Sequence, residues 1–300
     1  MTRREHYRDF YEGPACGSGG RTDGERPLGL VYGNCQAEAL RVLLDASPTF
    51  PWQLVRMPPV HELTADDLGP LRRLLSVSTL LVAQPVKDGY RSLPLGVGEV
   101  TQELAPGSQV VRWPVVFYTG LFPWQALVRV ADDVDPPGVP YHDLRTLTGR
   151  TPVEPDLAAV AERSVDELAR RERHTDVGVA DLVRGAGAGA VHTVNHPGNE
   201  LMIALAQRVQ AAVGTPRDAV DPGRVLLGAV RSPLEAGVLA ALELDPSLAR
   251  EDWLIGGEPV DPAGIVEVQR AWYAQRPDAV AEGHRRYAEA LPLLGLTAGG

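Results

Sequence analysis

The sequence predicts an α/β fold: a parallel sheet whose strands are connected by crossover helices. Short apolar runs that suit buried strands, at 28–32 and 79–83, alternate with segments of helical apolar spacing at 37–46 and 64–75. The chain has 300 residues, of which 44% are hydrophobic, so it is long enough to bury a sizeable core. Strands that alternate with helices in this way are typical of a parallel sheet.

The first strand, turn and helix contain the main chemical motif of the chain. The apolar run at 28–32 predicts a buried strand, and Gly33 allows a sharp turn before a helix with leucines on one face. Cys35 then lies at a helix N-terminus, where unpaired N–H groups and the helix dipole stabilise a thiolate and can hold an oxyanion. This order is that of a nucleophile elbow. The alternative interpretation is an inert, packed cysteine.

The elements that follow predict a crevice at one edge of the sheet. They are expected at 50–60 (extended), 64–75 (helix), 79–83 (strand) and 110–118 (strand, broken by Pro114). In a parallel sheet, ligands bind beyond the carboxyl ends of the strands. Cys35, Gln84 and Tyr118 fall at such ends, so we expect these three polar side chains at one crevice.

The second half of the chain contains a basic helix and a histidine segment. Helices are expected at 155–174, continuing over 176–184, and at 199–213. Arg170 and Arg171 belong to a basic flank that is either solvated or binds phosphate. His192 and His196 lie in an extended segment, because Pro197 disfavours a helix at His196. A histidine before a late helix suits a general base, or simply packs there.

Three consecutive segments are predicted. They are a flexible leader at 1–27, an α/β catalytic core at 28–220 with a helical insertion at about 131–190, and a largely helical region packed on the core at 221–300. The leader contains the aromatic residues Tyr7, Phe10 and Tyr11, which we expect to dock, either on the body of the protein or on a second copy of the chain.

Composition narrows the classes of ligand. The net charge of −10 and the pI of about 5.2 argue against non-specific nucleic-acid binding. Lys87 is the only lysine, so anion recognition rests mainly on arginine. Lys87, Tyr90 and Arg91 lie in the loop after Gln84, which is either only solvated or supplies phosphate contacts. The sequence contains no dinucleotide or P-loop motif and no metal-ligand spacing.

The cysteines and the N-terminus predict a cytoplasmic protein. Cys16 lies in a segment rich in Gly and Ser, so a structural disulfide with Cys35 is not expected. The first residues lack the apolar core of a signal peptide, and no run of about 18 apolar residues predicts a membrane span. The sequence leaves a homo-oligomer open.

The first turn resembles the opening signature of the WcbI-type polysaccharide-biosynthesis acetyltransferases. Residues 33–38 read Gly-Asn-Cys-Gln-Ala-Glu and precede a leucine-rich helix. The resemblance continues at 84–91, 164–184 and 195–197, and so covers roughly residues 28–210. Members of this family bind coenzyme A and are thought to acetylate capsular sugars. They are distantly similar to the SGNH hydrolases, whose first block is Gly-Asp-Ser, so the resemblance implies an SGNH- or flavodoxin-like core.

The resemblance implies a role for several polar residues. Cys35 becomes the nucleophile or shapes the oxyanion site, and His196, which matches the family's His-Pro pattern, becomes the general base. The implied oxyanion or substrate contacts are Gly33, Asn34, Gln36, Gln84, Tyr118 and Asn195, and the implied cofactor contacts are Lys87, Tyr90, Arg91, Arg170 and Arg171. SGNH enzymes have an Asp where this chain has Thr193, so the third triad member stays open among Asp88, Asn195 and Glu200.

Three functions fit these residues. The first is a CoA-dependent acyltransferase that passes an acetyl or related group from acetyl-CoA to a hydroxyl or amine of a sugar, polysaccharide or small metabolite. Transfer would proceed through a thioester at Cys35 or directly. The second is an ester or thioester hydrolase, and the third is a non-catalytic CoA-binding module with a structural Cys35. We adopt the acyltransferase, with a CoA donor and an acceptor as its partners, without a metal and without nucleic acid.

Overall fold

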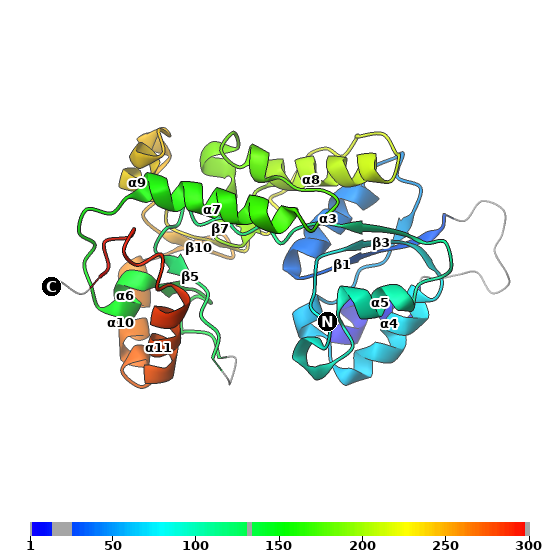
Figure 1. Cartoon of the computed structure of the whole chain (residues 1–300), viewed down its shortest axis with the longest axis horizontal. Coiled ribbons are helices and arrows are strands. Elements are labelled where there is room, and N and C mark those ends of the chain that lie inside the picture. Colours follow the sequence, from blue (N-terminus) through cyan, green and yellow to red (C-terminus); the bar gives the residue numbers. More distant parts are fainter. Residues whose placement is uncertain (1, 14–25, 131–133, 298–300) are drawn as a thin grey trace. The chain divides into compact units, whose positions relative to one another are not determined.

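The computed structural model describes residues 2–13, 26–130 and 134–297. The chain folds into two compact units (Figure 1). The first unit consists of Met1–Val115, Ala169–Leu182 and Asn199–Leu227, and the second of Val116–Leu168, Val183–Gly198 and Gly228–Gly300. The two units therefore interleave along the sequence, whereas the sequence suggested consecutive segments.

A four-stranded sheet lies at the centre of the first unit. Its strands are β2 (Gln53–Leu54), β1 (Leu28–Tyr32), β3 (Ser78–Ala83) and β4 (Gln109–Arg112), hydrogen-bonded in that order. Every neighbouring pair is parallel, which confirms the predicted α/β class. The strand order changes direction between β1 and β3, and such a switch point is where open α/β sheets bind ligands. Tyr32 pairs with Ala83, so both strands end at the same level.

Helices cover both faces of this sheet (Figure 1). On one face α3 (Cys35–Asp45) packs against α8 (Asn199–Ala212), and on the other lie α4 (Leu68–Leu75) and α5 (Val97–Gln102). The three leucines of the predicted face of α3 are fully buried. Helices on both faces are what a parallel sheet of apolar strands requires.

Two short helices precede the sheet, α1 (Arg3–His6) and α2 (Arg8–Glu12). Phe10 of α2 is fully buried in the core cluster of the first unit, and Tyr7 and Tyr11 pack against that cluster. The Tyr11 hydroxyl donates to the buried Asp67 carboxylate at 2.8 Å. These contacts confirm the predicted docking of the aromatic residues. Residues 14–25 of the predicted leader lie outside the described residues.

Two elements are shorter than the sequence predicted. The strand expected at 110–118 ends at Arg112, just before the break predicted at Pro114, because proline has no N–H group to continue the ladder. The basic helix is α7 (Leu157–Glu172), and its predicted continuation over 176–184 is wrong. The N–H groups of Asp176 and Val177 instead donate to the Arg112 carbonyl, so this segment crosses the end of β4.

Short 3₁₀ turns join the elements of both units. They are η1 (Val60–Glu62), η2 (Ala65–Asp67), η3 (Tyr90–Ser92), η4 (Ala180–Leu182), η5 (Gly187–Gly189) and η6 (Pro246–Leu248). The turn η2 begins with a capping box at Thr64, which is where the sequence predicts the start of a helix.

The second unit combines helices with short antiparallel strand pairs. Its helices are α6 (Leu144–Thr148), α9 (Ala236–Ala241), α10 (Pro262–Tyr273), α11 (Pro277–Arg286) and part of α7. Its strands pair as β5 (Gln125–Ala126) with β6 (His142–Asp143), β7 (Val191–Thr193) with β8 (His196–Pro197), and β10 (Trp253–Ile255) with β9 (Val230–Arg231) and β11 (Glu258–Val260). The C-terminal part is therefore helical as predicted, with a small sheet that the sequence did not reveal.

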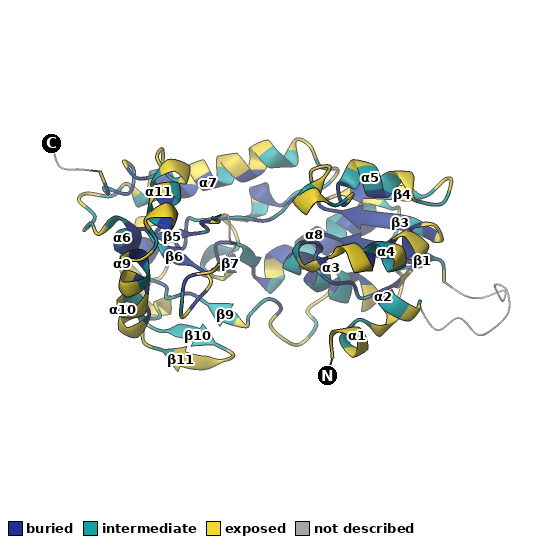
Figure 2. Ribbon diagram, turned by 90° about the horizontal axis from the view of Figure 1, so that it is seen from below, coloured by how far each residue is buried: buried dark blue, intermediate teal, exposed yellow. Residues whose placement is uncertain are grey.

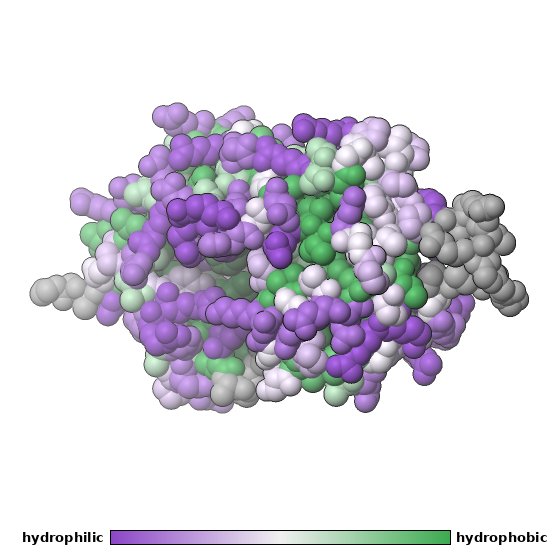
Figure 3. Space-filling view, turned by 45° about the vertical axis from the view of Figure 1, so that its right-hand side comes forward, coloured by the Kyte–Doolittle hydropathy of each residue, from purple (hydrophilic) through white to green (hydrophobic). Residues whose placement is uncertain are grey.

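Apolar residues are collected inside each unit. Figure 2 shows β3 as buried, whereas α10 and α11 carry exposed outer faces. In the second unit Trp124, Leu144, Tyr273 and Leu294 belong to one core cluster. Hydrophilic side chains cover much of the face seen in Figure 3, as expected when the apolar residues are inside. Among the described residues, no helix has the length and apolarity that crossing a membrane requires.

Candidate functional site

The turn between β1 and α3 is held by a side chain from the neighbouring strand end. Gln84, directly after β3, accepts the N–H of Asn34 through Oε1 at 2.8 Å. Its Nε2 donates to Gln36 Oε1 at 3.3 Å, and both glutamines are buried. Asn34 caps α3 by accepting the Gln36 N–H at 2.9 Å. The structure thus brings the predicted residues at 33–36 together with Gln84 at the switch point of the sheet.

Gly33 is required because Gln84 lies against it. A Cβ atom on Gly33 would lie 2.4 Å from Oε1 and 2.9 Å from Cγ of Gln84. No carbon atom fits at that distance, so any other residue would displace the Gln84 side chain. Gly33 therefore allows the Gln84 side chain to approach the backbone closely, in addition to the sharp turn that the sequence predicted.

Cys35 is the first residue of α3, and it is only partly exposed. Burial raises its pKa above the ordinary 9.0, while the N–H groups of Cys35 and Gln36 hydrogen-bond the sulfur and lower it. The negative charge of Glu62 raises the pKa further. The net direction is opposite to the stabilised thiolate that the helix N-terminus alone predicted. Cys35 is therefore a neutral thiol at neutral pH that has N–H donors directed at it.

The loop after Gln84 is ordered. Glu99 accepts the N–H groups of Gly89 and Gly96, at 3.0 and 2.7 Å. Tyr90 packs on the core of the first unit, while Lys87 and Arg91 are exposed. Arg91 has a φ of 54°, a left-handed conformation that is unfavourable for a non-glycine residue.

The other predicted cofactor residues, Arg170 and Arg171, lie on the last turn of α7, in the segment that belongs to the first unit. The first unit thus contains all five predicted cofactor residues. Tyr118, Asn195 and His196, by contrast, belong to the second unit.

The second unit places Tyr118, Asn195 and His196 around one hairpin, β7–β8. The Tyr118 N–H donates to the Val194 carbonyl at 2.8 Å. The Tyr141 hydroxyl donates to Asn195 Oδ1 at 2.9 Å, and its ring meets the His196 ring edge-on with the centroids 6.4 Å apart. The sequence pointed to the hairpin but not to Tyr141, which has no recognisable motif around it.

Burial makes His196 a neutral imidazole. It lowers the pKa of His196 to about 4. A histidine with this pKa is unprotonated at neutral pH and can accept a proton. Thr193 is fully buried, and its hydroxyl oxygen lies 2.9 Å from the Tyr141 hydroxyl and 3.1 Å from Asn195 Oδ1. At this position the chain therefore has a hydroxyl within a buried polar network.

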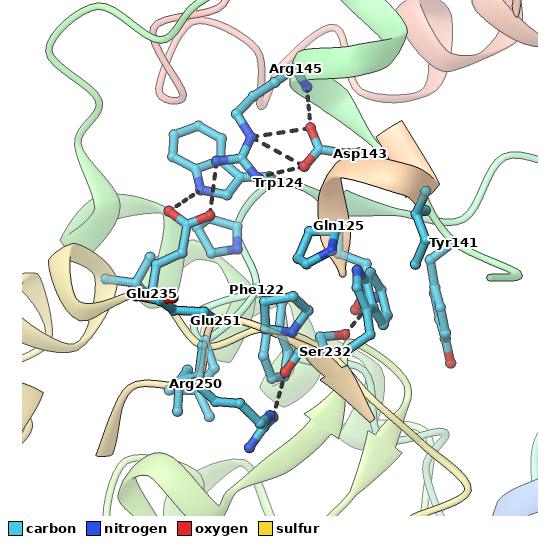
Figure 4. A pocket seen from close by; sticks show the side chains of 18 of the residues that line it. Phe122, Trp124, Gln125, Tyr141, Asp143, Arg145, Ser232, Glu235, Arg250 and Glu251 are labelled. Carbon is cyan, nitrogen blue, oxygen red and sulfur yellow. Dashed lines mark hydrogen bonds and ion pairs between the residues drawn. The ribbon is translucent and has the colours of Figure 1, made fainter. Parts of the chain in front are cut away.

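A cavity of about 420 Å³ opens within the second unit (Figure 4). Aromatic side chains in its wall are Phe122, Trp124, Tyr141 and Trp253, and charged ones are Asp143, Arg145, Glu235, Arg250 and Glu251. Sequence reasoning missed this cavity, because the residues of its wall are scattered along the sequence between positions 121 and 269. Among the described residues, no group of three or more His, Cys, Asp or Glu is arranged to hold a metal ion.

The chain matches one protein family and shares its fold with a solved structure. Residues 28–218 match the family described as polysaccharide biosynthesis enzyme WcbI. A solved structure is described as "Structural insights into WcbI, a novel polysaccharide biosynthesis enzyme", the native protein without a disulfide bond between CoA and a cysteine. It is similar with a TM-score of 0.73 and 22% identity, over 90% of this chain and 99% of that chain. At this identity the similarity establishes the fold. No curated protein matches the chain.

We predict that Gly33→Ala destabilises the protein by roughly 1–3 kcal/mol, because the added methyl group displaces Gln84 from a packed turn. The matched control is Gly69→Ala in α4, where a Cβ would meet nothing within 4 Å. There the free energy of unfolding should be unchanged or rise by about 0.5–1 kcal/mol. Urea denaturation measures both variants, and equal effects would contradict the close approach of Gln84.

We also predict that alkylation of Cys35 by iodoacetamide still accelerates above pH 9, because burial raises the pKa of the thiol beyond 9.0. The rate should rise with pH, since the thiolate is the reactive form. The experiment uses Cys16→Ser protein, so that only Cys35 is labelled. Glu62→Gln should shift the profile to lower pH, because it removes a negative charge that raises the pKa. A rate that levels off near pH 7 would refute this account.

Proposed function

This chain belongs to the WcbI polysaccharide biosynthesis enzyme family, and from that premise we propose that it transfers an acyl group from a CoA thioester to a hydroxyl or amine. The acceptor would be a sugar, a polysaccharide or a small metabolite. The observation that carries the proposal is the Cys35 thiol at the start of α3, with the N–H groups of Cys35 and Gln36 directed at it. The related structure described with CoA and a cysteine supports the choice of donor.

In the covalent route Cys35 Sγ attacks the carbonyl carbon of the thioester. The bond from that carbon to the CoA sulfur breaks, and CoA leaves with the proton of the Cys35 thiol. The acceptor hydroxyl then attacks the new thioester, its proton passes to His196, and Cys35 leaves as a thiolate that is protonated again. In the direct route His196 takes the proton of the acceptor as it attacks acetyl-CoA, and the turn only stabilises the oxyanion.

The remaining predicted residues receive proposed roles in binding. Gln84 and Asn34 would orient the turn, with Tyr118 and Asn195 as further contacts to substrate. Lys87, Tyr90, Arg91, Arg170 and Arg171 would contact the donor, whose phosphates suit guanidinium groups. The proposed location is the cytoplasm, where acyl-CoA donors are made.

The intact mass of the protein after mixing with acetyl-CoA tests this proposal. The covalent route predicts one added acetyl group on the wild type and on Cys16→Ser, and none on Cys35→Ser, because in this route the Cys35 sulfur carries the acetyl group. His196→Ala should be acetylated but should lose transfer to an acceptor by roughly 10²–10⁴-fold. Saturable CoA binding without an adduct would favour direct transfer. An absence of CoA binding would overturn the proposal.

A further inference from the structure

The cavity of the second unit is built against the hairpin that carries His196. Tyr141 lines the cavity, hydrogen-bonds Asn195 and meets the His196 ring edge-on. Gln125, also in the wall, accepts the Val194 N–H through Oε1 at 2.9 Å and donates to Ser232 Oγ at 2.8 Å. The residues of one cavity wall therefore also hold the β7–β8 hairpin in place.

The lining of the cavity suits a hydroxylated ring. Tyr141 and Trp253 stack with ring centroids 6.1 Å apart, so the wall contains a pair of packed aromatic rings. Trp124 offers a second aromatic surface, and carboxylates nearby can accept hydrogen bonds from hydroxyl groups. A few polar groups in an otherwise apolar and aromatic wall are typical of a small-molecule site.

The two arginines of the cavity differ in how their charge is compensated. Arg145 is paired with Asp143 at 2.6 Å and with Glu235 at 2.8 Å, and it lies over the Trp124 ring at 5.0 Å. Arg250 forms no ion pair among the described residues. It donates from Nη2 to the Ser232 carbonyl, and its buried Nε has no hydrogen-bond partner within the part of the chain that the structure describes.

A partly buried guanidinium without a counter-ion is unfavourable. Burial and the nearby charge of Arg231 lower the pKa of Arg250, and both act against its charged form. An anionic group in the cavity would offset this cost, and guanidinium recognises carboxylates and phosphates with paired hydrogen bonds. The position of Arg250 therefore selects for a ligand that supplies the missing negative charge.

We propose that this cavity binds the acyl acceptor as a hydroxylated ring that carries a carboxylate or a phosphate, and that Arg250 recognises the anionic group. The role of the ligand as acceptor rests on the proposed function above. The preference for an anion rests on the cavity alone. His196 lies behind Tyr141, on the hairpin that this wall supports, and is not itself a residue of the cavity wall.

Calorimetric titration with three probes tests the proposal: D-glucose, D-glucuronate and D-glucose 6-phosphate. The wild type should bind at least one anionic sugar about tenfold or more tightly than glucose. Whichever of the two anionic sugars binds more tightly identifies carboxylate or phosphate as the preferred group. Equal affinity for glucose and both anionic sugars, or no binding of either anionic sugar, would overturn the proposal.

Variants assign the charge recognition to one arginine. Arg250→Gln should lower the affinity for the anionic sugar by about tenfold or more and leave the affinity for glucose nearly unchanged. Arg250→Lys should retain part of the preference for the anionic sugar. The matched control is Arg270→Gln, because Arg270 is exposed on α10 and is not in the cavity wall. Unchanged affinity of Arg250→Gln for the anionic sugar would refute the assignment. The comparison of probes on the wild type holds even if a variant fails to fold.

The outcome is separable from that of the proposed function. Sugar binding that depends on Arg250, together with an absence of CoA binding, would leave the cavity assignment standing as a site for anionic hydroxylated rings and would remove the acyltransferase. CoA binding and acetylation of Cys35 with no sugar bound would do the reverse.

Discussion

The hydrogen bonds of Gln84 with the turn at 33–36 are the constraint on which the candidate site depends. They connect the ends of β1 and β3 at the point where the strand order reverses. The same side chain leaves no room for a Cβ at Gly33. The Asn34 cap and the Gln84 hydrogen bonds together hold the start of α3, and with it the N–H groups beside Cys35. A glutamine in this place acts as a structural brace, whatever ligand the turn holds.

Burial, more than local dipoles, sets the charge state of the two candidate reactive groups. It raises the pKa of the Cys35 thiol and lowers the pKa of His196 to about 4. Each group is therefore uncharged at neutral pH in its own unit. A neutral imidazole is ready to accept a proton, whereas a neutral thiol has to lose one before or while it attacks. The proposed reaction therefore requires the Cys35 thiol to lose its proton as it attacks, with no thiolate formed beforehand.

The sequence predicted the parallel sheet and the leading motif, because both depend on local pattern. The apolar runs of β1 and β3, the leucine face of α3 and the glycine of the turn all follow from spacing within a few residues. Pro114 marks the end of β4 in the sequence, but the segment at 176–177, which hydrogen-bonds Arg112 from more than sixty residues away, was predicted as helix because its pattern does not show this contact.

The cavity of the second unit was missed for the same kind of reason. Arg145 and Glu235 form an ion pair across 90 positions of the sequence, and no motif surrounds either of them. The pKa of Cys35 was predicted in the wrong direction, because the helix dipole is a local feature and burial depends on the whole fold. Residues whose role depends on distant neighbours cannot be recognised from one sequence.

Calorimetric titration of CoA into the wild-type protein and into Gln84→Ala tests the central claim most directly. If the turn that Gln84 holds binds the thioester, the wild type binds CoA saturably at one site per chain. Gln84→Ala should then weaken CoA binding by about tenfold or more, because the turn loses the hydrogen bonds of Gln84. An absence of CoA binding to the wild type, or equal binding by both proteins, would contradict the account.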